Sequence, residues 1–170
     1  MKLNHHTQNV EQRMEQMISK LKKYEFRITP QRLAVLRVLA ASNGHPSVEG
    51  IYDAVRKEFP TTSIATIYKT VNLLKQIDEV LEIAFPDGSN RYDGNNPFPH
   101  PHIICVHCKR IVHPDMESLE AIMDKAAEKT GFEILSHRLD FFGICNDCKT
   151  KKLGIISQRR DTPSSTVNRT

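Results

Sequence analysis

The chain contains no tryptophan, only four cysteines, few aromatic residues, and no apolar run approaching the roughly 18 residues of a membrane-spanning helix. The first residues, MKLNHHTQNVEQRMEQ, also lack the apolar centre of a secretory signal. We therefore expect a cytoplasmic protein without a membrane anchor, in which thiols stay reduced. The shortage of aromatic side chains argues against a single-stranded RNA-binding module, because such modules stack bases on aromatic platforms.

The four cysteines form two CxxC pairs, Cys105 with Cys108 and Cys145 with Cys148. Each CxxC turn places two sulfurs on one side of a metal, so two turns can complete a tetrahedral four-sulfur shell. This pattern favours structural Zn²⁺ over a redox dithiol, a pair of disulfides or a rubredoxin-like iron centre. A closed shell has no position for substrate, which indicates a scaffold. A thiol redox enzyme, the rival from another class, predicts cysteines that can be alkylated, whereas a zinc clamp predicts blocked thiols.

Charge is unevenly distributed along the 170 residues. Residues 1–75 carry twelve Lys/Arg against six Asp/Glu, residues 76–149 carry seven against thirteen, and residues 150–170 carry five against one. A basic part followed by an acidic part predicts a polyanion-binding domain joined to one that binds no polyanion. The length is sufficient for two small domains, of which zinc would stabilise the smaller.

Four helices are predicted in the basic part of the chain. The first spans residues 10–24, and the next three begin at the capping residues Thr29, Ser47 and Ser63. In the fourth helix, the apolar stripe expected to be buried consists of Ile64, Ile67, Val71 and Leu74. Its other side carries groups that can meet base edges in a major groove, although a solvated polar face is the more common arrangement. We expect base contacts from Thr66, Tyr68 and Lys69, and phosphate contacts from Lys22, Lys23 and Arg32.

Two strand-like runs, residues 79–85 and 89–93, flank the turn sequence Pro86-Asp87-Gly88 and predict a hairpin. Helices followed by such a wing describe a winged helix-turn-helix domain, which we assign to residues 1–93. Glycine, asparagine and proline then predict a linker over residues 94–100.

A small α/β domain is predicted over residues 101–149, with short strands at 102–105 and 110–112 beside the first CxxC turn. Apolar residues at helical spacing from Met116 to Ala126 predict a helix with Gly131 as its C-terminal cap. Alternation predicts a long strand over residues 132–144. Residues 150–170 are predicted to form a disordered basic tail. The expected fold class is α+β.

Histidines cluster beside the predicted linker. His100 and His102 lie on one face if this stretch is extended, and His113 follows. His45 and Asp93 lie at a loop and a strand end of the first domain. A lone histidine is usually structural or merely exposed. Four histidines and one aspartate near predicted domain junctions also fit a second metal site, and their spacing alone does not favour that site over the structural interpretation.

Several motifs together resemble the ferric uptake regulator (Fur) superfamily over about residues 20–149. They are Ile28-Thr-Pro-Gln-Arg32, Gly44-His-Pro46, Ser63-Ile-Ala-Thr-Ile-Tyr68, Asn90-Arg-Tyr-Asp93, His100-Pro-His-Ile-Ile-Cys105 with Cys108, and Gly143-Ile-Cys145 with Cys148. The resemblance implies a transcriptional repressor, not an enzyme, with a winged helix and a C-terminal domain that forms a homodimer. It also implies a regulatory metal between the domains that controls affinity for double-stranded DNA with a palindromic operator.

Asp93 and the four cysteines look most like the peroxide-sensing branch (PerR) of the superfamily. By resemblance, the regulatory site consists of His45, Asp93, His100, His102 and His113. Its expected ion is Fe²⁺ or Mn²⁺, and peroxide would oxidise His45 or His100. Peroxide sensors have an aspartate at position 113, and the additional imidazole shifts metal preference towards Zn²⁺, Co²⁺ or Ni²⁺. An iron- or zinc-uptake regulator is therefore the alternative, and Asp115 is a candidate replacement ligand.

A third metal site, known in iron-uptake members, is predicted to be absent. By resemblance it would use positions 99, 101, 120 and 137, and prolines at two of these cannot bind metal. We therefore assign structural roles to Glu120 and His137.

Overall fold

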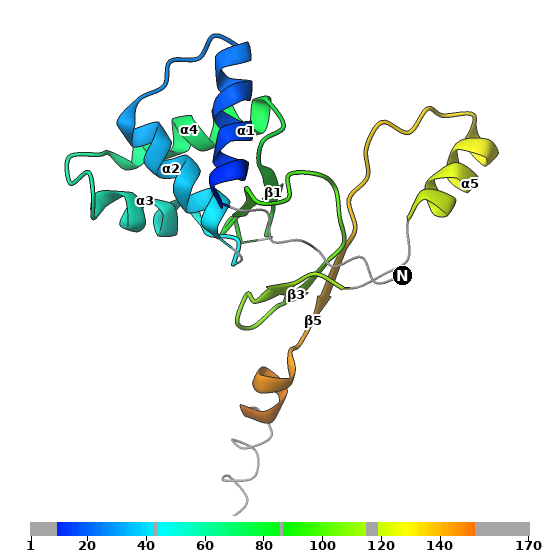
Figure 1. Ribbon diagram of the computed structural model, residues 1–170. Helices are drawn as coiled ribbons and strands as arrows, with labels where there is room; N and C mark the ends of the chain where they lie inside the picture. Colours follow the sequence, from blue (N-terminus) through cyan, green and yellow to red (C-terminus); the bar gives the residue numbers. More distant parts are fainter. Residues whose placement is uncertain (1–9, 43, 86, 115–118, 152–170) are drawn as a thin grey trace, which may run out of the picture. The chain divides into compact units, whose positions relative to one another are not determined.

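A computed structural model describes residues 10–42, 44–85, 87–114 and 119–151 (Figure 1). The chain forms two compact units, residues 1–99 and residues 100–170. Most of the predicted C-terminal tail lies outside the described residues, as do Asp115 and Met116. Within the described part of the chain, no helix is both long enough and apolar enough to cross a membrane.

Unit 1 begins with four helices that the sequence signals place correctly. They are α1 (Val10–Lys23), α2 (Pro30–Ala41), α3 (Val48–Arg56) and α4 (Ile64–Gln76). Thr29, Ser47 and Ser63 each accept a hydrogen bond at the side-chain oxygen from the backbone N–H three residues later. Such a cap satisfies a donor that the first helical turn leaves unpaired and contributes about 1 kcal/mol.

The helices enclose a continuous apolar core. Its fully buried members include Met17, Leu21, Leu36, Leu39, Ile51, Ile67 and Leu74. The predicted stripe of α4 is wrong at Ile64, which is 39% exposed, whereas Thr70 and Leu73 are buried. Ile64 is the first residue of α4, so it lies at the end of the helix rather than over the middle of the core.

A hairpin follows, with β1 (Leu81–Ile83) antiparallel to β2 (Arg91–Asp93). The paired strands are shorter than the predicted runs. Glu82, on β1, accepts hydrogen bonds from Asn90 Nδ2 at 2.8 Å and from the Tyr92 hydroxyl at 3.1 Å, and it pairs with Lys75 near the end of α4. The hairpin is therefore joined to the fourth helix by one carboxylate.

Unit 2 contains a small mixed sheet with strand order β4-β3-β5. Its strands are β3 (His102–Cys105), β4 (Ile111–Val112) and β5 (Asp140–Gly143). β3 pairs antiparallel with β4 and parallel with β5, so His102 lies opposite Asp140 and Cys105 opposite Gly143. Helix α5 (Glu120–Thr130) ends at Gly131, whose φ of 71° is the left-handed conformation of a helix C-cap.

The predicted strand over residues 132–144 is mostly wrong, because only residues 140–143 pair. A segment with alternating apolar residues forms a paired strand only where a neighbouring strand offers backbone hydrogen-bond partners. β3 has four residues, and each faces one residue of β5. The preceding segment is not in a strand, and its Phe132 and Leu135 are 74% and 86% exposed.

Candidate metal centres

The two CxxC turns of unit 2 bring their sulfur atoms together. All four Sγ atoms lie within 4.8 Å of one another, and Cys108 Sγ is 3.7 Å from Cys145 Sγ. Four sulfurs held at 2.3 Å around a tetrahedral ion would be about 3.8 Å apart. No disulfide joins the cysteines. The donor set and its spacing therefore fit Zn²⁺, as the sequence predicted.

The first turn is held by the sheet. Cys105 N–H donates to Arg110 O at 2.9 Å, and Val106 N–H donates to Gly143 O at 2.9 Å. The Cys145 N–H approaches Cys105 Sγ at 3.4 Å and thereby links the two turns. Since β3 and β5 are neighbours, strand pairing itself delivers Cys105 and Cys145 to one place.

The four thiols have unequal acidity. Backbone N–H groups of Cys108 and Cys145 lower the pKa of Cys105 to about 5, because they stabilise its thiolate. The N–H of Cys148 likewise lowers the pKa of Cys145. The neighbouring Cys145 sulfur raises the pKa of Cys148 to about 12. A divalent cation favours the thiolate form, so it would offset the effect that raises the pKa of Cys148 and would bind all four sulfurs as thiolates.

Two residues of the predicted regulatory set are paired inside unit 1. His45 Nε2 lies 3.0 Å from Asp93 Oδ2, and both side chains are 4% exposed. The other carboxylate oxygen, Oδ1, accepts N–H bonds from Asn95 at 2.9 Å and Asn96 at 2.8 Å. The hydrogen bonds to Oδ1 therefore orient the carboxylate, so that Oδ2 faces the imidazole.

Backbone geometry explains how residues 48 positions apart meet. Tyr92 N–H donates to Pro46 O at 3.0 Å, which joins the His45 loop to β2. Gly94 continues the chain past α2 so closely that an added Cβ would lie 2.6 Å from Leu39 Cβ. His45 itself has φ of 50°, a left-handed conformation that is uncommon outside glycine and concentrates at functional sites.

The other three predicted ligands cluster inside unit 2. The ring centroids of His100 and His102 are 4.3 Å apart, and His113 lies 4.6 Å and 5.2 Å from them. One nitrogen of each ring lies within 4.8 Å of a nitrogen of the others. Three converging imidazoles suit a borderline divalent ion such as Zn²⁺ or Fe²⁺. Each unit thus contains one part of the predicted regulatory set.

A buried carboxylate that we did not predict contacts this cluster. Asp140 Oδ1 lies 3.2 Å from His102 Nδ1, and the two side chains are 8% and 3% exposed. The sequence signal was weak: Asp140 is a single charged residue within the apolar run Leu139 to Phe142. Only the β3–β5 register identifies its partner.

The predicted DNA-reading side of α4 is accessible. Tyr68 is 44% exposed, Lys69 is exposed, and Thr66 is half-buried with its hydroxyl 3.0 Å from Ser63 Oγ. Lys22 and Lys23 are also exposed, whereas Arg32 is half-buried and its guanidinium donates to Arg27 O. These positions permit DNA contacts, which stay a prediction.

Comparison with known proteins assigns the family. The ferric uptake regulator family model matches residues 23–142. Peroxide-responsive repressor PerR of Staphylococcus aureus (strain Mu50) is 38% identical over 144 residues, which cover 85% of this chain and 97% of that protein. The solved Helicobacter pylori ferric uptake regulator Fur, described with three functional metal binding sites, matches with a TM-score of 0.72 and 27% identity, covering 88% of this chain and 97% of that one. A zinc-bound manganese uptake regulator matches with a TM-score of 0.59 and 29% identity, covering 76% and 98%.

These matches confirm the predicted resemblance and the predicted fold class, a winged helix-turn-helix followed by a small α/β domain with a four-cysteine cluster. They also confirm, at the level of the family, the prediction of a metal-dependent repressor. The chain belongs to the ferric uptake regulator family.

Proposed function

We propose that this protein is a peroxide- and metal-responsive transcriptional repressor, which binds a palindromic operator in double-stranded DNA as a homodimer. The S. aureus relatives named peroxide-responsive repressor favour this function over that of an iron- or zinc-uptake regulator. The protein acts by binding rather than by catalytic turnover. Its site of action is the cytoplasm, where the thiols of the four-cysteine cluster stay reduced for structural Zn²⁺.

The observation that carries this proposal is the division of the ligands between the units. His45 and Asp93 offer two donors in unit 1, and His100, His102 and His113 offer three in unit 2. When bound to all five, Fe²⁺ or Mn²⁺ would supply a Lewis-acid centre, with Zn²⁺ as the competing ion. The two ligand sets would then hold the units in one relative orientation.

This orientation would be the output of the switch. In a twofold dimer it sets the separation of the two α4 helices, which must match successive major-groove faces of the operator. A shift of the binding-competent form from rare to dominant needs a differential affinity of about 10⁴, or roughly 5.5 kcal/mol. Four or five ligand bonds can supply a difference of this size.

The exposed apolar side chains of unit 2 support the homodimer. Among its described residues the buried apolar side chains are Ile104 and Cys105, and α5 buries none. Its exposed large apolar residues are Ile103, Val106, Val112, Ile122, Phe132, Leu135, Phe141 and Phe142. Apolar surface concentrated in this way marks a protein–protein interface.

Operator binding should depend on the regulatory metal while the zinc cluster stays intact. The test measures affinity for operator DNA in protein that retains one equivalent of zinc, with and without added Mn²⁺. We expect Mn²⁺ to increase affinity by at least a hundredfold, and His45→Ala and His100→Ala each to abolish the increase. Equal affinity with and without Mn²⁺ would overturn the metal switch.

Peroxide sensing has a separate test. Reaction of one peroxide molecule with a coordinating histidine adds one oxygen atom to the ring and leaves one water molecule. We expect mass spectrometry of Fe²⁺-loaded protein to find this oxygen on peptides containing His45 or His100. Zn²⁺-loaded protein is the control, because Zn²⁺ has no redox chemistry. If neither peptide gains oxygen, the protein answers to metal supply alone.

A further inference from the structure

A carboxylate on β5 holds one of the imidazoles of unit 2. Asp140 Oδ1 lies 3.2 Å from His102 Nδ1, and Arg138 Nε donates to the other oxygen, Oδ2. His102 is also held through its backbone, since its N–H donates to Leu139 O at 3.0 Å. The two hydrogen bonds therefore hold His102 beside Asp140, with Nδ1 of its ring directed at the carboxylate.

This contact selects one tautomer of His102. An ionised carboxylate can only accept hydrogen bonds, so the proton of the neutral ring lies on Nδ1. Nε2 then keeps its lone pair, which is the form of histidine that binds metal. The rings of His100 and His113 lie beside it, with centroids 4.3 Å and 5.2 Å from that of His102.

We propose that Asp140 is a positioning residue of the regulatory site, which holds His102 as the Nδ1–H tautomer and thereby sets the affinity of unit 2 for the regulatory ion. This inference rests on the proposed metal-binding function of the histidine cluster. A carboxylate on the far nitrogen of a ligating histidine fixes the ring and raises its basicity, and its removal typically weakens metal binding by about 10–100-fold. Arg138 supports the carboxylate from the solvent side, since its side chain is 52% exposed.

The first test uses the full-length protein with its zinc cluster loaded and no regulatory metal. Nitrogen-15 NMR of the histidine rings identifies which nitrogen of His102 carries the proton. We expect the Nδ1–H tautomer in the wild type and a mixture of tautomers in Asp140→Asn, because an amide can donate as well as accept. An unchanged tautomer in Asp140→Asn would overturn the proposal, whatever the protein's affinity for metal.

The second test measures Mn²⁺ affinity from the electron paramagnetic resonance signal of the free ion. We expect Asp140→Asn to weaken binding by about 10–100-fold, and Asp140→Glu to restore part of the loss. Asp124→Asn, which removes an exposed carboxylate from α5, is the matched control and should leave binding unchanged. Equal affinity of wild type and Asp140→Asn would contradict the positioning role.

One result separates this inference from the proposed function. If wild type and His100→Ala bind Mn²⁺ equally, the proposed metal site fails, while the NMR result still reports on Asp140.

If Asp140→Asn loses zinc or helical structure, Arg138→Gln replaces it, because this change weakens support of the carboxylate from an exposed position. We expect Arg138→Gln to reduce Mn²⁺ affinity several-fold, and no reduction would reject the proposal.

Discussion

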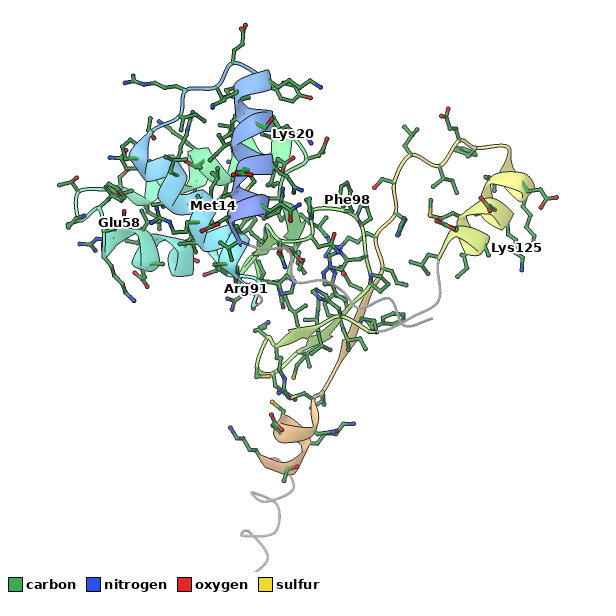
Figure 2. All side chains as sticks on the ribbon, viewed as in Figure 1. Met14, Lys20, Glu58, Arg91, Phe98 and Lys125 are labelled. Atoms are coloured by element: carbon green, nitrogen blue, oxygen red, sulfur yellow. The ribbon has the colours of Figure 1, made fainter. Side chains whose placement is uncertain are left out.

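Arg13 is a buried cation that joins three segments of unit 1. Its Nε donates to Gly94 O at 2.7 Å, its Nη2 donates to Glu79 O at 2.9 Å, and its Nη1 pairs with the Glu79 carboxylate. Lys20, labelled on α1 in Figure 2, lies with its Nζ 3.2 Å from the other Glu79 oxygen. Since Gly94 directly follows Asp93, this network fixes the strand end that carries a candidate ligand.

Removal of Arg13 should be costly because it leaves a buried carboxylate with a single partner. We expect Arg13→Met to lower the free energy of unfolding by about 3 kcal/mol, measured by urea denaturation with circular dichroism. Arg37→Ala is the matched control: Arg37 pairs with Glu58 at 2.8 Å, but both side chains are more than half exposed. Its loss should be below about 1 kcal/mol. Equal losses in the two variants would show that the buried network adds no stability.

Helix α4 has one side buried in the core and another side that faces solvent. Ile67, Val71 and Leu74 anchor it in the core, while Tyr68 and Lys69 face solvent. A positively charged group on a helix that enters a groove contacts phosphates or base edges and releases counterions.

Replacement of Lys69 tests the position of this helix on DNA. We expect Lys69→Ala to weaken operator binding and to reduce the dependence of affinity on salt by about one ion, measured by fluorescence anisotropy at several salt concentrations. Lys125→Ala on α5, labelled in Figure 2, removes the same charge from unit 2 and should change neither quantity. Unchanged binding in Lys69→Ala would mean that another element reads the operator.

The hairpin depends on the charge of Glu82. Burial alone would raise the pKa of this carboxyl, but hydrogen bonds from Lys75 and Asn90 outweigh burial and lower the pKa below its ordinary value. Burial and the Glu82 charge raise the pKa of Tyr92, so its hydroxyl remains a donor to that carboxylate. Because the folded pKa is lower than the unfolded one, Glu82 stabilises the fold above the unfolded value, and this stabilisation is lost as pH falls through the folded value.

Glu82→Gln should therefore have an effect that depends on pH. We expect it to reduce the free energy of unfolding by about 1–2 kcal/mol at neutral pH, because it removes charge-assisted hydrogen bonds. The difference from wild type should vanish below the folded pKa of Glu82, where the wild-type carboxyl is protonated and therefore neutral, like the amide of glutamine. Urea denaturation across this range provides the measurement. A difference that persists in acid would assign the effect to packing rather than charge.

The two units differ in how much apolar surface they bury. Unit 1 has a core shared by its helices and hairpin. In unit 2, the outer strand β5 presents Phe141 and Phe142, which are 42% and 53% exposed. An uncovered apolar strand at a sheet edge is prone to association, and a twofold partner would cover it.

The proposed homodimer gives this surface a test. We expect Phe142→Asp to convert dimers to monomers in analytical ultracentrifugation, because a charge would be buried without a partner in the interface. Tyr24→Asp changes a similarly exposed aromatic residue of unit 1 and should leave the dimer intact. Dimers in both variants would place the interface elsewhere.

Sequence alone determined the features that depend on neighbours within a few positions. The helix caps at Thr29, Ser47 and Ser63 and the glycine cap at Gly131 follow from local backbone donors and acceptors, and the structure contains them all. CxxC spacing predicted the two sulfurs of each turn, since each turn is a local unit, whereas the pairing of β3 with β5 brings the two turns together. The DNA contacts and the domain boundaries stay predictions.

Contacts between residues that lie far apart in the sequence depend on the tertiary structure. The alternation in residues 132–144 does not show how much of that run finds a partner, and in the structure residues 140–143 pair with β3. Likewise, no local pattern joins Asp140 to His102, 38 positions away, or Arg13 to Glu79, 66 positions away. These contacts exist because strand register and helix packing bring distant residues into hydrogen-bond range, where burial makes the choice of partner decisive.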